Sequence, residues 1–384
     1  MASAPLNTYK DLIDHLVDFL GAQPTGEARR DARRAAANGL RQLATAGNWF
    51  YYYQRGRLLT NGQYTTGTVA YTQSNYSVTL TGGSFPSWAL YGCIQIQNIV
   101  YQVAGNPDPQ TLVLAACSNP GADLAAGQSF TLYRDTYPLP ADCQAIDRMI
   151  LEGYAFSLWY EHPDIWLERQ RIYRGPAVPR VYTVRGEPHY FGVMAVSFFP
   201  PPDAAYPFDF IYKRLPRPMV LEGYSTGSAS ATAGSTTITG SGTSWSSSMV
   251  GSVIRLSADS VNPPTDLVGP NPAIYEGVVL AVASASSLTA DTPSPSTLGS
   301  VQYVISDPVD IEVGAMLNAL LRCCEYQLAL TRSRADVAQL AAQYREALIL
   351  AREADSRNMA LEAAGTIPRY PYRLAQMPRG PDVS

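Results

Sequence analysis

The side chains that could carry acid–base or metal chemistry are few and scattered in this sequence. Its three histidines are His15, His162 and His189. None of them has a cysteine or carboxylate partner at a metal-ligand spacing such as H-E-x-x-H, and no Walker loop or G-x-G-x-x-G is present. The carboxylates closest to a catalytic acid–base pairing are Glu152, Glu161, Asp164 and Glu168. Because no apolar pocket pattern flanks them, we predict no catalytic residue, no metal site and no cofactor.

The most regular pattern of charge lies on a segment with helical spacing, residues 27–46. Its arginines are Arg29, Arg30, Arg33, Arg34 and Arg41. The first four form two i,i+4 pairs on one broad face, which Arg41 extends. Such a face can contact DNA phosphates or an acidic partner, and it can equally be a solvated face whose charges pair with Glu27 and Asp31. No aromatic stacking platform is interleaved, so any contact with genomic DNA would be non-specific.

The composition favours a folded chain that makes protein interfaces. Charged residues form 16% of the 384 residues, below the roughly 25% that is usual. With 28 basic and 32 acidic residues the net charge is -4, so no global basic field points to nucleic acid. Tyrosine is abundant, with 25 residues, and Lys10 and Lys213 are the only lysines. Interfaces are enriched in Tyr and Arg and depleted in Lys.

The sequence does not indicate a membrane-spanning, secreted or disulfide-stabilised protein. It has no run of about 18 apolar residues that could span a membrane, and no signal peptide is visible at its start. The five cysteines are Cys93, Cys117, Cys143, Cys323 and Cys324. Their odd number and the lack of a C-x-x-C pair argue against a disulfide framework and structural zinc, so we expect reduced, buried thiols.

The elements that position these residues are helices at both ends. Apolar periodicity predicts helices over 9–20, 27–46, 308–331 and 334–363. Thr8 with Asp11 has the spacing of a capping box, and Asp307 before Pro308 has that of a helix cap. The run 49–53 is strand-like, a short helix begins at Pro163, and strands follow over 180–184, 191–197 and 208–213.

Two stretches rich in Thr, Ser and Gly, 58–130 and 225–300, form an internal repeat. A shift of 160 positions aligns them over about thirty residues, pairing Gly67 with Gly227 and Gly82 with Gly242. After a longer loop in the second copy, 274–275 aligns with 100–101 and 287–288 with 111–112. Each copy is predicted to be a small β-barrel or sandwich of five or six short strands.

We therefore predict an α+β fold, in which a helical bundle scaffold carries two inserted, mutually similar small β-barrel or sandwich modules and a central mixed strand segment. The predicted domains are N-terminal helices (1–57), the first module (58–136), the central segment (137–224), the second module (225–307), C-terminal helices (308–363) and an extended Pro-rich tail (364–384).

Three phrases of the sequence carry a resemblance to structural proteins of tailed bacteriophages. They are Gly234-Ser-Thr-Thr-Ile-Thr-Gly-Ser-Gly-Thr-Ser-Trp245 with its continuation Met249-Val-Gly-Ser-Val-Ile-Arg-Leu256, the module exit Tyr133-Arg-Asp-Thr-Tyr-Pro-Leu-Pro-Ala-Asp142, and Phe210-Ile-Tyr-Lys-Arg-Leu-Pro-Arg-Pro218. With the order of the elements, they resemble the head-to-tail adaptors (connector or neck proteins) of short-tailed phages, the tail tubular protein A-like group. The duplicated module departs from that pattern.

The resemblance implies a structural virion protein, made in the host cytoplasm and located in the neck. It implies a homo-oligomeric ring of twelve copies that joins the portal protein to the tail tube or nozzle protein, docks tail fibres and leaves a channel for DNA. The helices would form the ring body, and the tail would bind portal clefts through Pro368, Arg369, Tyr370 and Tyr372. The arginines of 27–46 would face either the DNA or an acidic portal surface.

Two other classes of function remain open. The duplicated modules could bind carbohydrate or a receptor, with Trp88 and Trp245 as stacking residues, although a place in the module cores is the favoured interpretation of both tryptophans. An enzyme acting on cell wall or capsule is the third class, and it has the least support because no catalytic constellation is visible.

Overall fold

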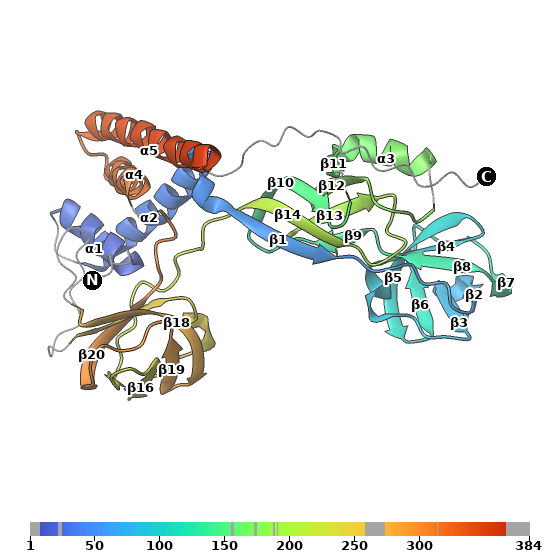
Figure 1. Cartoon of the computed structure of the whole chain (residues 1–384), viewed down its shortest axis with the longest axis horizontal. Helices are drawn as coiled ribbons and strands as arrows, with labels where there is room; N and C mark the ends of the chain where they lie inside the picture. The colour runs from blue at the N-terminus through green and yellow to red at the C-terminus, as the bar shows by residue number, and fades with distance from the viewer. Residues whose placement is uncertain are drawn as a thin grey trace, which may run out of the picture. The chain divides into compact units, whose positions relative to one another are not determined.

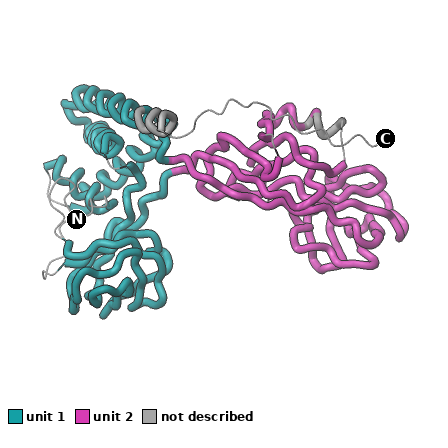
Figure 2. Tube along the Cα trace, viewed as in Figure 1, with its two compact units in different colours: residues 1–51, 216–384 teal, residues 52–215 magenta. Residues whose placement is uncertain are grey.

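The computed structural model describes residues 8–21, 25–154, 157–172, 175–186, 189, 191–257, 273–312 and 314–365. The chain forms two compact units (Figure 2): residues 1–51 with 216–384 make the first unit, and residues 52–215 make the second. Helices and several β-sheets occur together, so the predicted α+β class is confirmed.

Four helices of the first unit pack against one another (Figure 1). They are α1 (Tyr9–Phe19), α2 (Gly26–Ala46), α4 (Ala315–Thr331) and α5 (Val337–Gly365). Helix α2 buries a row of alanines and leucines and packs on α4, which in turn packs on α5. The two helices approach closely at Gly39 of α2, where a Cβ would lie 2.5 Å from Sγ of Cys324 on α4. A small residue is therefore required at this crossing of α2 and α4.

The sequence predicted the start of α1 correctly and the start of α4 wrongly. The capping box at α1 is confirmed, because the Thr8 hydroxyl accepts from the Asp11 amide while the Asp11 carboxylate accepts from the Thr8 amide. The predicted start of a helix at Pro308 is wrong, since α4 begins at Ala315. The carboxylate of Asp307 accepts instead from the backbone amides of Val220 and Leu221, at 2.8 and 2.7 Å.

The run that was predicted to be strand-like, 49–53, is also different in the structure. Trp49 is buried, and its indole Nε1 donates to the carbonyl of Leu43 at 2.7 Å. This folds the chain back against the end of α2, so that residues Phe50–Tyr52 form a 3-10 turn before β1 begins at Tyr53.

A closed barrel completes the first unit. Its strands are β15 (Ser228–Ala231), β16 (Thr237–Ser241), β17 (Val253–Ser257), β18 (Tyr275–Ser284), β19 (Ser287–Ala290) and β20 (Leu298–Ser306), in the order β15-β16-β19-β18-β17-β20. Alternate residues of each strand point inward, as the period of two requires, and Ile254, Leu288 and Ile305 are fully buried. The barrel thus has a core of its own.

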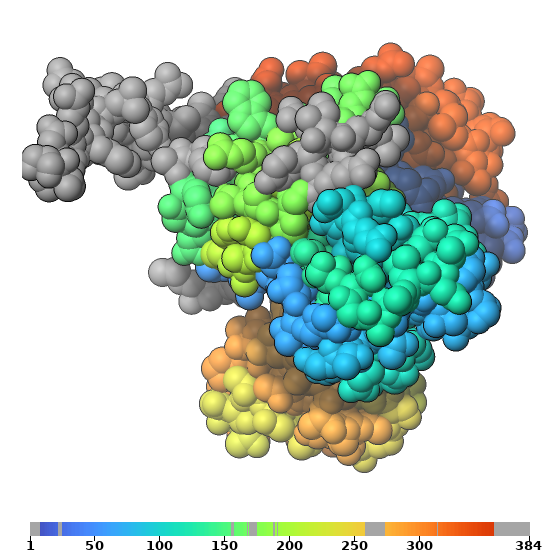
Figure 3. All heavy atoms as spheres, turned by 90° about the vertical axis from the view of Figure 1, so that its right-hand side faces the viewer, coloured from blue at the N-terminus to red at the C-terminus, as the bar shows by residue number. Residues whose placement is uncertain are grey.

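The second unit contains a seven-stranded sheet whose surface is coloured from light blue through cyan to blue-green in Figure 3. Its strands are β2 (Thr68–Thr72), β3 (Ser77–Thr81), β4 (Cys93–Ile96), β5 (Ile99–Asp108), β6 (Thr111–Leu114), β7 (Leu124–Gln128) and β8 (Phe130–Tyr133), in the order β7-β2-β3-β6-β5-β4-β8. This order repeats that of the barrel, with β7 and β8 together taking the place of β20.

The two copies agree in backbone detail. In each, a tyrosine before the first strand pairs with the last one, Tyr64 with Leu132 and Tyr224 with Ile305. The aligned glycines at 67 and 227 both have positive φ, and a Cβ at either would lie within about 2.4 Å of a carbonyl oxygen, at 2.4 and 2.3 Å. Only glycine adopts this conformation readily, so the glycine pairs mark the same turn in both copies.

The strand register corrects one part of the sequence alignment. Val103 pairs with Leu114 in the seven-stranded sheet, and Val279 pairs with Ala290 in the barrel. The shift across these strands is therefore 176 positions, as it is between 111–112 and 287–288. The alignment of 274–275 with 100–101 is two residues out of register, and a shift of two leaves the alternation of the strand unchanged, so the alternation could not reveal it.

The rest of the second unit is a pair of small sheets packed face to face. One contains β1 (Tyr53–Leu59), β14 (Pro207–Arg214) and β10 (Cys143–Leu151), and the other contains β11 (Trp159–Tyr160), β12 (Val181–Gly186), β13 (Met194–Phe199) and β9 (Thr136–Pro138). Phe198 and Phe208 stack between the sheets with ring centroids 4.4 Å apart. Helix α3 (Pro163–Ile172) begins at Pro163 as predicted and packs on β12.

Candidate interaction surface

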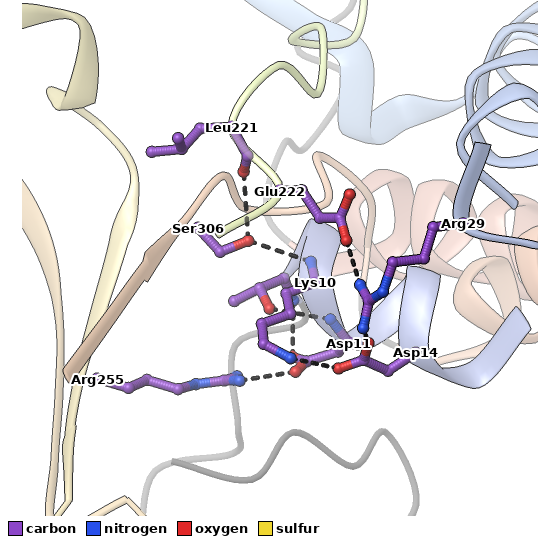
Figure 4. Close-up of polar contacts among 9 residues, drawn as sticks. Lys10, Asp11, Asp14, Arg29, Leu221, Glu222, Arg255 and Ser306 are labelled. Atoms are coloured by element: carbon purple, nitrogen blue, oxygen red, sulfur yellow. Dashed lines mark hydrogen bonds and ion pairs between the residues drawn. The ribbon is translucent and has the colours of Figure 1, made fainter. Parts of the chain in front are cut away.

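A buried ion-pair cluster joins helix α1 to the barrel within the first unit (Figure 4). Arg255 on β17 donates from Nη1 to the Asp11 carboxylate on α1 at 2.8 Å, and from Nε to Glu276 on β18 at 2.7 Å. Arg255 and Asp11 are 3% and 2% exposed. Burial opposes the charge on Arg255, yet the hydrogen bonds and charges of the two carboxylates raise its guanidinium pKa above the ordinary value.

Two of the five arginines on α2 belong to the same junction. Arg29 bonds to Asp14 on α1, with Nη2 and the carboxylate 2.8 Å apart, and to Glu222 in the segment that leads into the barrel. Arg33 bonds to the other oxygen of Glu222. Both arginines therefore tie α2 to its neighbours in the fold.

Asp307, which directly follows the last barrel strand β20, accepts several hydrogen bonds at the point where the chain leaves the barrel. Besides the amides of Val220 and Leu221, it accepts from the Ser252 hydroxyl at 2.7 Å. The backbone of α1 continues the junction, since the amide of Tyr9 donates to the carbonyl of Asp307 at 2.7 Å. The sequence pointed to Asp11 and Asp307 only as helix caps and gave no sign of Glu222 or Arg255, because the partners at this junction lie up to 244 residues apart.

The other three arginines of α2 face solvent. Arg30, Arg34 and Arg41 are exposed, and within the described part of the chain none of them forms an ion pair. The acids that could have neutralised the stripe are engaged elsewhere. Asp31 and Glu27 pair with Arg332 at the end of α4, at 2.6 and 3.6 Å. The predicted stripe is thus divided into a paired row and an unpaired row.

Of the two tryptophans proposed for stacking, Trp245 lies in a module core and Trp88 lies against one. Trp245 is 4% exposed, and its indole Nε1 donates to the Tyr303 hydroxyl at 3.1 Å inside the barrel. Its ring meets that of Tyr303 edge-on at 5.7 Å, so no face of Trp245 is open to a sugar. Trp88 is partly buried and packs against the core of the seven-stranded sheet.

The histidines do not come together into a site. His15 on α1 bonds to the buried Glu325 of α4 at 3.1 Å, His162 lies 3.1 Å from Asp164 at the start of α3, and His189 meets the edge of the Tyr91 ring. Among the described residues, no three His, Cys, Asp or Glu side chains are grouped to hold a metal ion. No described helix is long and apolar enough to cross a membrane.

One stretch has the spacing of a hydrolase nucleophile elbow, G-x-S-x-G, at residues 223–227. That motif requires a sharp turn from a strand into a helix. Here the stretch leads into β15 of the barrel, and Tyr224 within it pairs with Ile305 of β20. The spacing is therefore not accompanied by the geometry of an elbow.

The predicted portal contacts Pro368, Arg369, Tyr370 and Tyr372 lie outside the described residues. On the described part of the chain, two features could contact a partner. They are the unpaired arginine row of α2 and the large apolar side chains exposed on α5 and on the central sheets.

Comparison with known families agrees with that description. Residues 110–231 match the family of the SU10 adaptor protein. This similarity supports a phage adaptor. It covers about a third of the chain, from β6 to β15 with α3 included, and leaves α1, α2, α4 and α5 outside the match. No curated protein matches the sequence.

Proposed function

We propose that this chain is a structural adaptor of a bacteriophage virion that connects the head to the tail. The single observation that carries the proposal is the match of residues 110–231 to the SU10 adaptor family, whose members are structural proteins. The match covers the central sheets, in which the phrase at 210–218 also resembled adaptors. The phrase lies within the matched range, so the two observations concern the same part of the sequence.

The finer proposal is a ring of the tail tubular protein A-like kind, in a short-tailed phage, with twelve copies of this chain. Its partners would be the portal protein on one side and the tail tube or nozzle protein on the other, with tail fibres docked at its periphery. The channel of the ring would admit the genome during ejection, and the tail residues 364–384 would bind the portal.

Exposed apolar side chains on α5 support protein contacts by the helices. Ile349 and Leu350, adjacent on that helix, are 56% and 52% exposed. The low overall charge and high tyrosine content point the same way. Catalysis has no part in this proposal, because the matched family is one of adaptor proteins.

The proposal is tested by locating the chain in purified particles with electron microscopy. A ring of this chain between portal and tail is the expected result, and density for the chain at the fibres, inside the capsid or nowhere in the particle would refute the proposal.

The tail contact is tested by capture of purified portal protein. Tyr370→Ser with Tyr372→Ser should lower the amount of portal captured, while the matched control Tyr370→Phe with Tyr372→Phe keeps both rings and should capture as much as the wild type. Equal capture by all three chains would remove the tail from the proposal.

A further inference from the structure

The unpaired row of α2, which consists of Arg30, Arg34 and Arg41, has no role in holding the fold together. Arg29 and Arg33, one position before the first two, bond to Asp14 and Glu222 and belong to the junction with α1 and the barrel. We propose that Arg30, Arg34 and Arg41 contact the phosphate backbone of duplex DNA without regard to its sequence. The identification of that DNA as the phage genome rests on the proposed function.

The spacing of the row suits a regular polyanion. The three arginines are four and seven residues apart, so they follow one face of the helix. At a rise of 1.5 Å per residue the separations are about 6 and about 10.5 Å along the axis. A DNA strand carries a phosphate about every 3.4 Å of its axis, so each guanidinium can meet a different phosphate.

The charge of the row is not cancelled by neighbours on its own helix. Between Arg30 and Arg41 the other exposed residues are Arg33, Ala37 and Asn38, and no carboxylate lies among them. Glu27 and Asp31, the acids at the start of the helix, are held by Arg332. The row therefore keeps a positive potential in a chain whose net charge is -4.

The absence of apolar anchors favours DNA over an acidic protein as the partner. Protein interfaces are centred on large, buried apolar or aromatic side chains, and charges lie at their rim. The exposed face of α2 between Arg30 and Arg41 carries no large apolar side chain, whereas α5 exposes Ile349 and Leu350. Sequence-independent phosphate contact requires no apolar centre.

Three phosphate contacts predict a definite salt dependence. With a slope of about -0.9 per contact, log K should fall by about 2.7 for each tenfold increase in salt. Between 50 and 200 mM salt, the affinity of the full chain for duplex DNA should fall about 40-fold. Two duplexes of unrelated sequence should bind equally.

The experiment measures binding of the full chain to two labelled duplexes by fluorescence anisotropy over this range of salt. Arg30→Gln with Arg34→Gln and Arg41→Gln should abolish most of the salt slope. The matched control is Arg55→Gln with Arg57→Gln and Arg148→Gln, three exposed arginines of the β1-β14-β10 sheet, which removes the same charge and should leave the slope near -2.7. Arg30→Lys with Arg34→Lys and Arg41→Lys should keep the slope.

Several results would overturn the inference. They are no binding by the wild type at low salt, an unchanged slope in the α2 glutamine variant, or an equal loss in the control. The same variants are then expressed in an infection with a phage that lacks its own copy of the gene, and particles are purified. Normal incorporation of the α2 glutamine variant supports the inference further.

Loss of incorporation with unchanged DNA binding would mean that the row contacts an acidic protein, which overturns the inference and leaves the adaptor proposal intact. If the wild-type chain is absent from particles but its DNA binding depends on the row, the inference stands and the adaptor proposal fails.

Discussion

The buried pair between Asp11 and Arg255 offers the sharpest test of how the helices are held to the barrel. Asp11→Asn keeps the shape of the side chain and removes its charge. One of the two partners of Arg255 then becomes neutral, while Arg255 stays 3% exposed and Glu276 remains at 2.7 Å. Breaking a buried ion pair by removing one partner costs about 3–5 kcal/mol.

That cost is expected to fall on the junction of α1 with the barrel. The amides of α1 and β17 should exchange with solvent deuterium about two to three orders of magnitude faster, because each tenfold change corresponds to about 1.4 kcal/mol. Hydrogen exchange with mass spectrometry locates the effect by peptide, which a single unfolding midpoint of a two-unit chain cannot do.

The matched control is Glu152→Gln, which removes a carboxylate from a pair with Arg57 whose side chains are 53% and 59% exposed. An exposed pair contributes about 0–1 kcal/mol, so exchange in β1 and β10 should change little. The reasoning is refuted if both substitutions have similar effects, or if Asp11→Asn changes exchange in α1 by less than about fivefold. Arg255→Met combined with Asp11→Leu and Glu276→Leu should recover part of the loss, since replacing all three charged side chains by apolar ones removes the buried charges together.

Three further predictions follow from single features of the first unit. Gly39→Ala should lower the free energy of unfolding by about 1–3 kcal/mol, because its Cβ would overlap Sγ of Cys324, whereas Gly26→Ala has open space and should be neutral or slightly stabilising in a thermal melt. Burial opposes the charge of Glu325, but hydrogen bonds from His15 and Arg322 lower its pKa below the ordinary glutamate value. The ionised carboxylate therefore stabilises the fold above the ordinary pKa, and this stabilisation is lost as the pH falls through the lowered pKa. The melting temperature of Glu325→Gln should depend less on pH between about 5 and about 3 than that of the wild type, and equal pH profiles would contradict this. Burial raises the pKa of the Cys323 thiol to about 11 and that of Cys324 well above its ordinary value, so a thiol reagent at pH 8 should label the exposed Cys117 in the folded chain and reach the α4 pair only after unfolding.

Local patterns in the sequence predicted those elements whose signals and partners are close together. Thr8 and Asp11 are three residues apart and cap α1 as expected, and Pro163 begins α3. The repeat could be found because Gly67 and Gly227 occupy a turn that requires positive φ, which restricts the residue type in both copies.

Local patterns did not predict features that depend on contacts between distant segments. Asp307 before Pro308 has the pattern of a helix cap, but its carboxylate is used by amides 86 and 87 residues away, so the helix begins later. The arginines of α2 have the same type and periodicity, and nothing local shows that Arg29 and Arg33 meet Glu222 while Arg30 and Arg34 meet solvent. The position of the segment 216–224, which carries Glu222, decides which of two adjacent arginines is paired. That position depends on the tertiary structure and not on the local sequence of α2.

Three segments of this chain begin and end at paired strands. Tyr53 pairs with Lys213 at the two ends of the second unit, and inside that unit Tyr64 pairs with Leu132 at the ends of the seven-stranded sheet. Tyr224 and Ile305 do the same for the barrel. The two ends of each segment are therefore adjacent in the structure, and the seven-stranded sheet is inserted within the second unit. A segment with adjacent ends can be gained, lost or exchanged by a single recombination event while the flanking chain remains continuous. The copying of one module into a second site is a step that this arrangement makes easy.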